Sequence, residues 1–321
     1  MRWRIALSSA AAVGLAAAGF AAPAQADLTT HCEGVAEDVT VPNDLVVPEG
    51  ASCDLTNVTI EGNVTVQSGA DFIGDGVTIT GQLDVEDDAY ADTVGSEVDG
   101  NVNLNSAYGV YLEGGAVNNA YAEDSGFLYS VETEHGNVLD SVNGETYLES
   151  STVGNIATDG DIITDVYDTW VSGAFQVYNA EQGSVLCSSE VDGNAILQNN
   201  GGIIQIGADE PLGGCDTSYV GGNLNVSENT ADSFISDTIV GGNLNCMNND
   251  PAPVGENNRV RGQQLNQCED MAAPESASTM SAQESVEQVE SRKQAILDKI
   301  EARTAEGEEK ADAAGTADIG N

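Results

Sequence analysis

Runs of acidic residues are the part of this sequence whose residue types and spacing could do chemistry. Two runs stand out: Glu86, Asp87 and Asp88 with Asp92 close behind, and Asp159, Asp161 and Asp165. Carboxylate oxygens are hard ligands that suit Ca²⁺, so both runs are candidate calcium sites. Paired carboxyl groups can also hydrolyse a glycosidic bond. Neither an EF-hand loop nor a calcium-binding nonapeptide is present, and we favour the simpler interpretation of a solvated acidic surface.

Other side chains that could catalyse a reaction are scarce. The histidines are His31 and His135, too few general bases to support a Ser-His-Asp arrangement. The six cysteines form no CxxC pair, which argues against a thiolate metal site. We therefore predict that the protein is not an enzyme and needs no cofactor, with Ca²⁺ as the one candidate ligand.

A repeat of about 19 residues must position these side chains. Its core is Gly-Asn-φ-x-φ, where φ is apolar, and in-phase copies start at residues 43, 62, 81, 100, 118, 136, 154, 173, 193, 222 and 242. The one long interval contains the insertion GADEPLGGCD. Alternating apolar residues predict a strand with one buried face, and Gly or Asn at the first position predicts a bend with positive φ.

This period, with short strands and no helix, predicts an all-β fold in which each repeat is one coil of a parallel β-solenoid. We expect about twelve coils of 18–20 residues over residues 43–268. At about 4.8 Å per coil the rod would be about 55 Å long. A right-handed solenoid is favoured because the aliphatic-glycine hexapeptide of left-handed solenoids is absent.

Stacked coils would align the second position of the repeat into an asparagine ladder. Its members are Asn63, Asn101, Asn119, Asn137, Asn155, Asn194, Asn223 and Asn243. Side-chain amides stacked in this way hydrogen-bond one coil to the next, and we favour this structural role over a row of ligand contacts. Asp140 occupies a predicted inward position, which indicates either a slipped register or a buried site.

The six cysteines predict three disulfides. All of them follow residues 1–26, which we predict to be a signal peptide for export. An even number of cysteines in an exported chain argues for disulfide bonds. Cysteines about one coil apart could stack, once the insertion is discounted. This spacing predicts the pairs Cys32–Cys53, Cys187–Cys215 and Cys246–Cys268. Two of the three would hold the ends of the solenoid, where open edges need protection.

The two ends of the chain differ in composition from the middle. Residues 1–26 have a basic start, an apolar stretch and an Ala-Gln-Ala cleavage site, which predicts a signal peptide and a secreted protein. Residues 27–42 would form an N-terminal cap. No second apolar span follows, so we expect no membrane span after signal removal.

After the solenoid we expect a linker at 269–280, a helix at 281–306 and a disordered tail at 307–321. The helix would carry a thin apolar stripe formed by Val286, Val289, Ile296 and Ile300. This stripe is too short for a stable coiled coil, so a solvated helix is favoured and self-association through 281–306 is the alternative.

The charge balance limits the partners. The chain has 53 acidic and 9 basic residues, a formal net charge of -44. Nucleic acid is excluded because phosphate contacts need Lys and Arg, and anionic membranes or glycans would need bridging cations. Between Asp27 and Asn258 there are 40 acidic residues and no Lys or Arg. We therefore expect an acidic rod with a mixed-charge end, at which all of its positive charge lies.

The repeats resemble those of secreted bacterial parallel β-helix proteins. The stretch VGGNLNVSENTADSFISDTIVGGNLNC, which carries GGNLxC-type repeats, is similar to uncharacterised secreted actinobacterial proteins. The resemblance covers residues 43–268 loosely and 219–268 more closely, and it implies an extracellular rod of no known activity. Asp87-Asp88 also resembles the paired aspartates of polygalacturonase-type β-helices, but their flanking motifs are missing.

We therefore expect a secreted structural or interaction protein of the cell surface or extracellular matrix. Its flat face would bind an extracellular protein or a cell-wall component. The alternatives are a carbohydrate-active or carbohydrate-binding β-helix that uses Asp pairs, and a Ca²⁺-binding surface protein.

Overall fold

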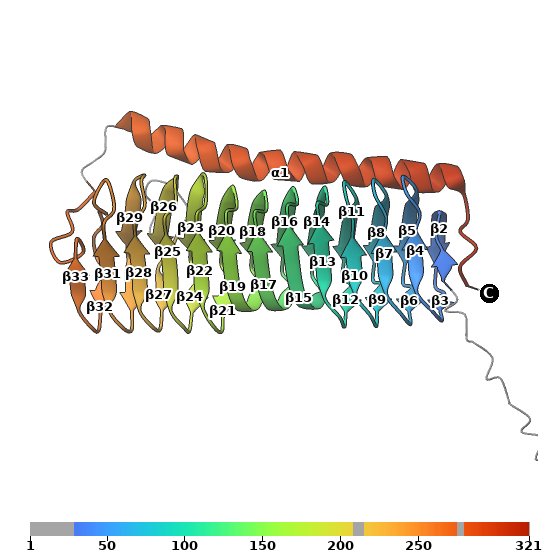
Figure 1. The fold of residues 1–321 in the computed structure, drawn as a ribbon, viewed down its shortest axis with the longest axis horizontal. Coiled ribbons are helices and arrows are strands. Elements are labelled where there is room, and N and C mark those ends of the chain that lie inside the picture. The colour runs from blue at the N-terminus through green and yellow to red at the C-terminus, as the bar shows by residue number, and fades with distance from the viewer. Residues whose placement is uncertain (1–28, 208–214, 275–278, 321) are drawn as a thin grey trace, which may run out of the picture.

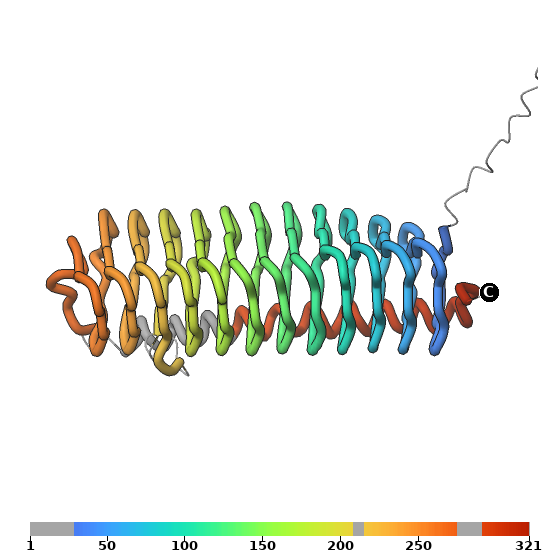
Figure 2. The backbone as a smooth tube through the Cα atoms, turned by 90° about the horizontal axis from the view of Figure 1, so that it is seen from below, coloured from blue at the N-terminus to red at the C-terminus, as the bar shows by residue number. Residues whose placement is uncertain are grey.

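The computed structural model describes residues 29–207, 215–274 and 279–320. Across them the chain winds into a parallel β-solenoid of about twelve turns, and a long helix lies along one side of the rod (Figures 1 and 2). The predicted all-β parallel solenoid with a C-terminal helix is therefore confirmed. The predicted signal peptide, residues 1–26, lies outside the described residues.

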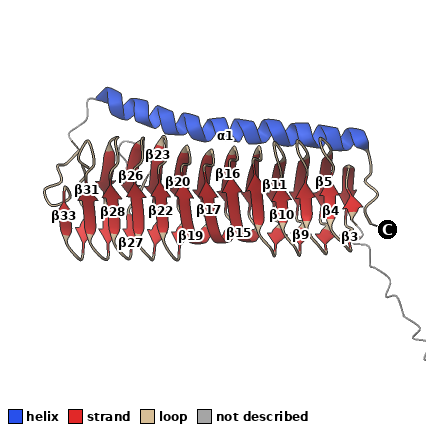
Figure 3. Ribbon diagram, viewed as in Figure 1, coloured by secondary structure: helices blue, strands red, loops and turns tan. Residues whose placement is uncertain are grey.

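The strands of the described residues form two parallel sheets, drawn in red in Figure 3. Sheet A has 22 strands: β1 (Thr30–His31), β3 (Thr40–Val41), β4 (Leu45–Val47), β6 (Thr59–Ile60), β7 (Val64–Val66), β9 (Thr78–Ile79), β10 (Leu83–Val85), β12 (Glu97–Val98), β13 (Val102–Asn105), β15 (Ala116–Glu123), β17 (Glu134–Ser141), β19 (Thr152–Asp159), β21 (Trp170–Val171), β22 (Phe175–Tyr178), β24 (Glu190–Val191), β25 (Ala195–Gln198), β27 (Ser218–Val220), β28 (Leu224–Ser227), β30 (Thr238–Val240), β31 (Leu244–Met247), β32 (Arg259–Val260) and β33 (Gln264–Asn266). Sheet B has 11 strands: β2 (Gly34–Glu37), β5 (Ser52–Thr56), β8 (Asp71–Asp75), β11 (Tyr90–Val94), β14 (Gly109–Glu113), β16 (Phe127–Val131), β18 (Glu145–Glu149), β20 (Ile163–Tyr167), β23 (Gly183–Cys187), β26 (Ile203–Gly207) and β29 (Ser233–Ser236).

Equivalent positions of successive repeats stack in register. Leu83 pairs with Val64 on one side and with Val102 on the other. These side chains are fully buried, as the alternating pattern predicts, and burying each contributes about 1.5–3 kcal/mol. The core is therefore a column of aliphatic residues along the axis of the rod.

The repeated glycine serves close stacking rather than positive φ. Gly81 and Gly100 do not lie in the left-handed region, so the expected reason for glycine is wrong. A Cβ at Gly81 would collide with the carbonyl oxygen of Gly62, and a Cβ at Gly100 with that of Gly81. Positive φ occurs at other turns, for example at Asn57 and Asp88. Glycine is required because the backbones of successive turns touch at this point.

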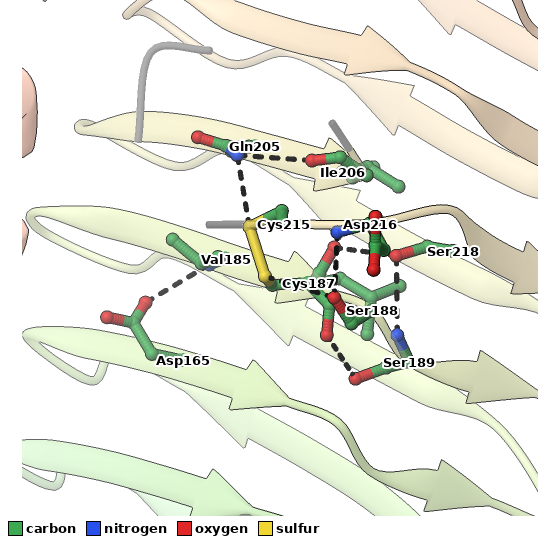
Figure 4. Close-up of a disulfide and its surroundings, with 12 residues drawn as sticks. Asp165, Val185, Cys187, Ser188, Ser189, Gln205, Ile206, Cys215, Asp216 and Ser218 are labelled. Atoms are coloured by element: carbon green, nitrogen blue, oxygen red, sulfur yellow. Dashed lines mark hydrogen bonds between the residues drawn. A yellow bond between two sulfur atoms is a disulfide. The ribbon is translucent and has the colours of Figure 1, made fainter. Parts of the chain in front are cut away.

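The three predicted disulfides are present. Cys32–Cys53, Cys187–Cys215 and Cys246–Cys268 join Cα atoms 5.5, 5.1 and 5.2 Å apart. In the middle pair, Cys215 lies near the end of the insertion and also accepts a hydrogen bond from the Gln205 amide (Figure 4). The spacing argument succeeds because each bond links neighbouring turns of the same solenoid.

The predicted asparagine ladder is confirmed in two stretches. Amide groups hydrogen-bond from Asn155 to Asn137, from Asn137 to Asn119 and from Asn119 to Asn101, at 2.8, 2.7 and 3.0 Å. A second stretch joins Asn194, Asn223 and Asn243 through their side chains and backbone N–H groups. A further ladder, which the repeat motif did not predict, lies buried inside the rod at Asn200, Asn229 and Asn249.

The ends of the chain differ from the prediction. Residues 30–41 form β1, β2 and β3, which pair with β4, β5 and β6, so the expected N-terminal cap is the first turn of the solenoid. The helix α1 (Thr279–Ala314) continues past the expected end at residue 306. Residues 315–320, expected to be disordered, lie against β2. Part of the expected linker is also ordered, since Ala272 pairs with Val254.

The helix runs back along the rod, and its C-terminal end lies beside the first turn (Figure 1). Its basic residues are therefore distributed along the acidic rod rather than gathered at one end. The expectation that all the positive charge lies at one end of the rod is wrong. The single helix of 36 residues brings Arg303 to Asp71, which is more than 200 residues earlier in the chain. At 1.5 Å per residue, such a helix spans about 54 Å, which matches the length of the rod.

Candidate functional site

A ladder of tyrosines lies on the outer face of sheet B. Tyr111, Tyr129 and Tyr147 are in register in β14, β16 and β18, and Tyr167 of β20 continues the stack. The rings of Tyr129 and Tyr147 are 4.4 Å apart and nearly parallel, and those of Tyr147 and Tyr167 are 5.3 Å apart. Such stacking adds about 0.5–1.5 kcal/mol per pair beyond area burial. We call the outer face of β8 to β20 in sheet B the covered face.

The helix α1 packs on this covered face. Ile296 and Ile300 are buried in one cluster with Tyr90, Phe127 and Tyr147. The apolar stripe expected on the helix is thus confirmed at these two positions, but its partner is the rod. Ile296 and Ile300 are buried against the rod, so they offer no free apolar surface for self-association. The side chains of residues 279–290, which include Val286 and Val289, are not among those that the structure describes.

The basic residues of α1 meet acidic residues of the covered face. Lys293 pairs with Glu149 at 2.8 Å, and Lys299 with Glu145 at 3.3 Å. Asp71, which is fully buried, receives both Arg303 at 2.5 Å and Lys310 at 3.2 Å. A buried carboxylate is stable only when paired and hydrogen-bonded, so these contacts fix the position of the helix.

Two further contacts hold the second half of α1. Thr304 donates a hydrogen bond to Asp92 at 2.6 Å, and the Tyr90 hydroxyl donates to the same carboxylate at 3.2 Å. Burial under the helix raises the pKa of Asp92. Gly307 allows the close approach, since a Cβ there would lie 3.1 Å from that of Asp71 and 3.3 Å from the Ile73 side chain. Glycine, which predicts the end of a helix, here permits the helix to pack.

The structure does not bring the first acidic run together. Glu86, Asp87 and Asp88 are exposed in the turn before β11, and Asp88 has positive φ. Asp92 instead lies under α1. The run is therefore split between a solvated turn and the covered face.

The second acidic run is divided in the same way. Asp159 is exposed, whereas Asp161 points into the interior and Asp165 lies on the covered face. Burial raises the pKa of Asp165 to about 6, against the opposing effect of the Arg292 guanidinium. Among the described residues, no group of three or more His, Cys, Asp or Glu side chains could hold a metal ion.

A small polar network interrupts the apolar core in the middle of the rod. Asp140 is buried in register between Ala122 and Thr158, so its inward position is real and not a register slip. Its Oδ2 lies 2.6 Å from the Thr146 hydroxyl, which is also 3.0 Å from Asp161 Oδ2. Burial raises the pKa of Asp140 to about 8 and that of Asp161 to about 6.

A buried histidine lies in the same strand as Asp140, at the other end of β17. His135 Nε2 is 2.7 Å from the Ser130 hydroxyl, and its Nδ1 has no hydrogen-bond partner. Burial lowers the pKa of His135 to about 4, so the ring is neutral at pH 7. Because it is enclosed in the core, His135 offers no base to a substrate at the surface.

The covered face was missed by reasoning from the sequence, although a signal for it exists. Tyr111, Tyr129, Tyr147 and Asp165 are each 18 residues apart, the same period as the glycine motif at that part of the chain. A search for other residue types that recur every 18 residues, at positions outside the glycine motif, would have identified the tyrosine ladder. The contact with α1 has no local signal, since its partners lie more than 100 residues away.

Comparisons with protein-family models, with curated proteins and with solved structures find no match to this chain. None of the helical segments in the described part of the chain has the length and apolar character needed to span a membrane.

Proposed function

We propose that this protein is a secreted, rod-shaped structural or interaction protein of the cell surface or extracellular matrix. Export is supported by the three disulfides, which form and persist in oxidising compartments, and by the predicted signal peptide. The rod would present its free sheet face to an extracellular protein or a cell-wall component.

The observation that carries this proposal is the closure of the covered face by the chain's own helix. This face gathers stacked aromatic rings and acidic groups, the kind of surface that would otherwise bind a ligand. Asp71, Glu145 and Glu149 are paired with basic residues of α1. The tyrosines pack in one cluster with Ile296 and Ile300. These groups therefore stabilise the rod and are not available to a substrate.

In the described part of the chain, the outer face of sheet A carries no helix, and we propose it as the surface left for a partner. Exposed aromatic side chains on it are Tyr121 and Trp170, with 37% and 47% of their surface accessible. The Trp170 indole donates to Asp192 in the next turn at 3.3 Å, which holds the ring in place. An exposed aromatic ring that is already held in place can bind a partner with little loss of entropy.

Binding to isolated cell-wall material and to immobilised extracellular protein tests the proposal. We expect the protein to bind one of them, and the variant Tyr121→Ser/Trp170→Ser to bind at least about tenfold more weakly, a loss of about 1.4 kcal/mol. Val94→Ser, an exposed apolar residue in sheet B, is the matched control and should bind normally. Absence of binding to both materials would contradict the proposal.

A carbohydrate-active enzyme is the alternative that an activity assay would detect. We expect no product from a panel of neutral and anionic glycans. Turnover that disappears in an Asp87→Asn/Asp88→Asn variant would refute the structural role, because both side chains are exposed and Asn tolerates the positive φ of Asp88.

Calcium binding is the second alternative. We expect the melting temperature to be the same in Ca²⁺ and in EDTA, because both acidic runs are divided between different environments. A melting temperature that is higher in Ca²⁺ than in EDTA, with the difference lost in Asp87→Asn/Asp88→Asn, would show a calcium site in the first run.

A further inference from the structure

We propose that residues 315–320 are an intramolecular cap on the first turn of the rod. We propose further that, once uncovered, this end pairs with the last turn of a second copy of the chain. The inference goes beyond the proposed function and rests on the fold alone, so that binding to a cell-wall or protein partner does not affect it.

The cap continues sheet B beyond its first strand. The Val35 N–H donates to the Gly315 carbonyl at 2.8 Å, and the Ala317 N–H donates to the Val35 carbonyl at 2.9 Å. Thr316 thereby forms a parallel bridge with Val35 of β2. An uncovered strand edge offers unpaired backbone groups to another chain, and here the C-terminal segment occupies them (Figure 1).

Side chains of the cap also close the end of the core. Ala317 and Ile319 are 9% and 4% exposed and belong to the main core cluster. Gly34 makes the approach possible, since a Cβ there would collide with the Gly315 carbonyl oxygen. Beside the cap a groove of about 400 Å³ remains, lined by Val35, Val39, Asp54, Thr56 and Ile319. The cap thus covers the apolar end of the rod without filling it.

The opposite end of the rod has the complementary edges. In sheet A, β32 and β33 are the last strands, and in sheet B Ala272 forms the last bridge. At the first turn, β1 and β3 are the corresponding edges of sheet A, and β2 is that of sheet B. A second copy is the partner that offers both edges at matching spacing, because every turn has the same cross-section.

Charge also favours pairing of unlike ends. Arg259 and Arg261, the basic residues of the solenoid's last turn, have no ion-pair partner among the described residues. The first turn carries exposed Glu33, Glu37 and Asp38. The last turn also carries exposed Glu269 and Asp270, so the gain comes from these two arginines meeting the acids of the first turn. Contact between two first turns would be repulsive, because their exposed charged groups are acidic.

A chain that ends at Ala314 tests the proposal, since it keeps α1 and all its ion pairs. Mass should be measured by light scattering and sedimentation velocity over a wide range of protein concentration. We expect the full-length chain to remain monomeric, and the shortened chain to form dimers and longer species whose mean mass grows with concentration. Adding Arg259→Glu/Arg261→Glu to the shortened chain should return it to the monomer.

Two outcomes would overturn the proposal. One is a shortened chain that remains folded, by circular dichroism and thermal melting, and monomeric. The other is assembly that the arginine substitutions do not change. If the shortened chain does not fold, the full-length Ile319→Asp variant loosens the cap, with exposed Thr316→Ser as its control. Ile319→Asp that is folded and monomeric at all concentrations would equally refute the proposal.

Discussion

At the scale of single residues, Thr146 presents a question of proton balance. Its hydroxyl has one proton to donate, yet it lies within hydrogen-bond distance of both Asp140 and Asp161. The Asn143 amide donates to the same oxygen at 3.2 Å. Asp161 also accepts from the Asn143 backbone N–H and the Thr164 hydroxyl. A protonated Asp140 would donate to Thr146 and leave the Thr146 hydroxyl to donate to Asp161. Asp140 is the protonated one at pH 7, because burial raises its pKa to about 8.

This arrangement predicts a pH dependence that Asp140→Asn removes. The unfolded chain loses the Asp140 proton near pH 4, while the folded chain keeps it up to about pH 8. The folded state therefore binds more protons in this range, and the free energy of unfolding falls by up to about 1.4 kcal/mol per pH unit as pH rises. The substituted amide does not titrate, so the variant should gain stability over the wild type from pH 5 to pH 8.

Urea unfolding across this pH range measures the effect. Asp161 lowers the free energy of unfolding as pH rises from 4 to about 6, and neutral His135 raises it between about 4 and 6.5. Both groups are present in wild type and variant, so the difference in free energy between the two proteins is the quantity to compare. Asp159→Asn, on an exposed residue of the next turn, is the control. Parallel curves for wild type and Asp140→Asn would show that Asp140 ionises normally.

At the scale of elements, the docking of α1 depends on a few unequal contacts. Arg303 and Asp71 are 14% and 0% exposed, whereas Lys299 is 46% exposed in its pair with Glu145. Water screens the second pair far more than the first. We therefore expect the Arg303 contact to contribute most of the electrostatic attachment of the helix.

Arg303→Met should accordingly detach or loosen α1. Removing one partner of a buried pair leaves Asp71 with Lys310 and the Ser52 hydroxyl, and we expect a loss of about 3 kcal/mol. Lys299→Met, the matched control, should cost less than about 1 kcal/mol. Limited proteolysis of the helix and thermal melting measure both, and equal effects of the two substitutions would contradict this ranking.

Gly307 tests whether the helix is held by shape as well as by charge. Gly307→Leu should displace α1 locally, because even a Cβ lies within 3.3 Å of Ile73 and 3.1 Å of Asp71. In an isolated helix the same change would stabilise by about 1 kcal/mol. Ala313→Leu, at an exposed position of the same helix, is the control. We expect near-ultraviolet circular dichroism of the buried tyrosines to fall only for Gly307→Leu.

At the scale of the whole molecule, the two ends of the rod are stabilised differently. Each turn contacts mainly its neighbours, so the ends are the places where unfolding begins. The first turn is held by Cys32–Cys53, by α1 and by residues 315–320. The last turn is held by Cys246–Cys268, and its last sheet A strand, β33, pairs with no further strand among the described residues.

Removal of each terminal disulfide should therefore have unequal effects. Replacing Cys246 and Cys268 by Ser frees a loop of 22 residues, a loss of about 3 kcal/mol, and should increase amide hydrogen exchange in the last turns alone. Replacing Cys32 and Cys53 by Ser should increase exchange less, because the helix and the cap remain in place. Faster exchange along the whole rod in either variant would show that the turns unfold together.

Much of the fold could be predicted because the same interactions recur in every turn. Each interior position is decided by its neighbours in the adjacent coils, so a period of 18–20 residues is enough to align Leu83 with Val102 and Asn119 with Asn137. The disulfides follow from the same register. The candidate site was less predictable, because exposure of a carboxylate such as Asp92 depends on what covers it.

The sequence by itself determined the solenoid, its register, its asparagine ladder and its cross-links, since these are interactions between neighbouring turns. Only the tertiary structure decided the path of α1, the covering of the tyrosine ladder and the cap formed by residues 315–320. Those contacts join segments more than 100 residues apart, and neither the helical pattern of α1 nor the strand pattern of sheet B specifies its partner. The acidic charge that looked like a property of an open surface is, at Asp71, Glu145 and Glu149, half of an internal interface.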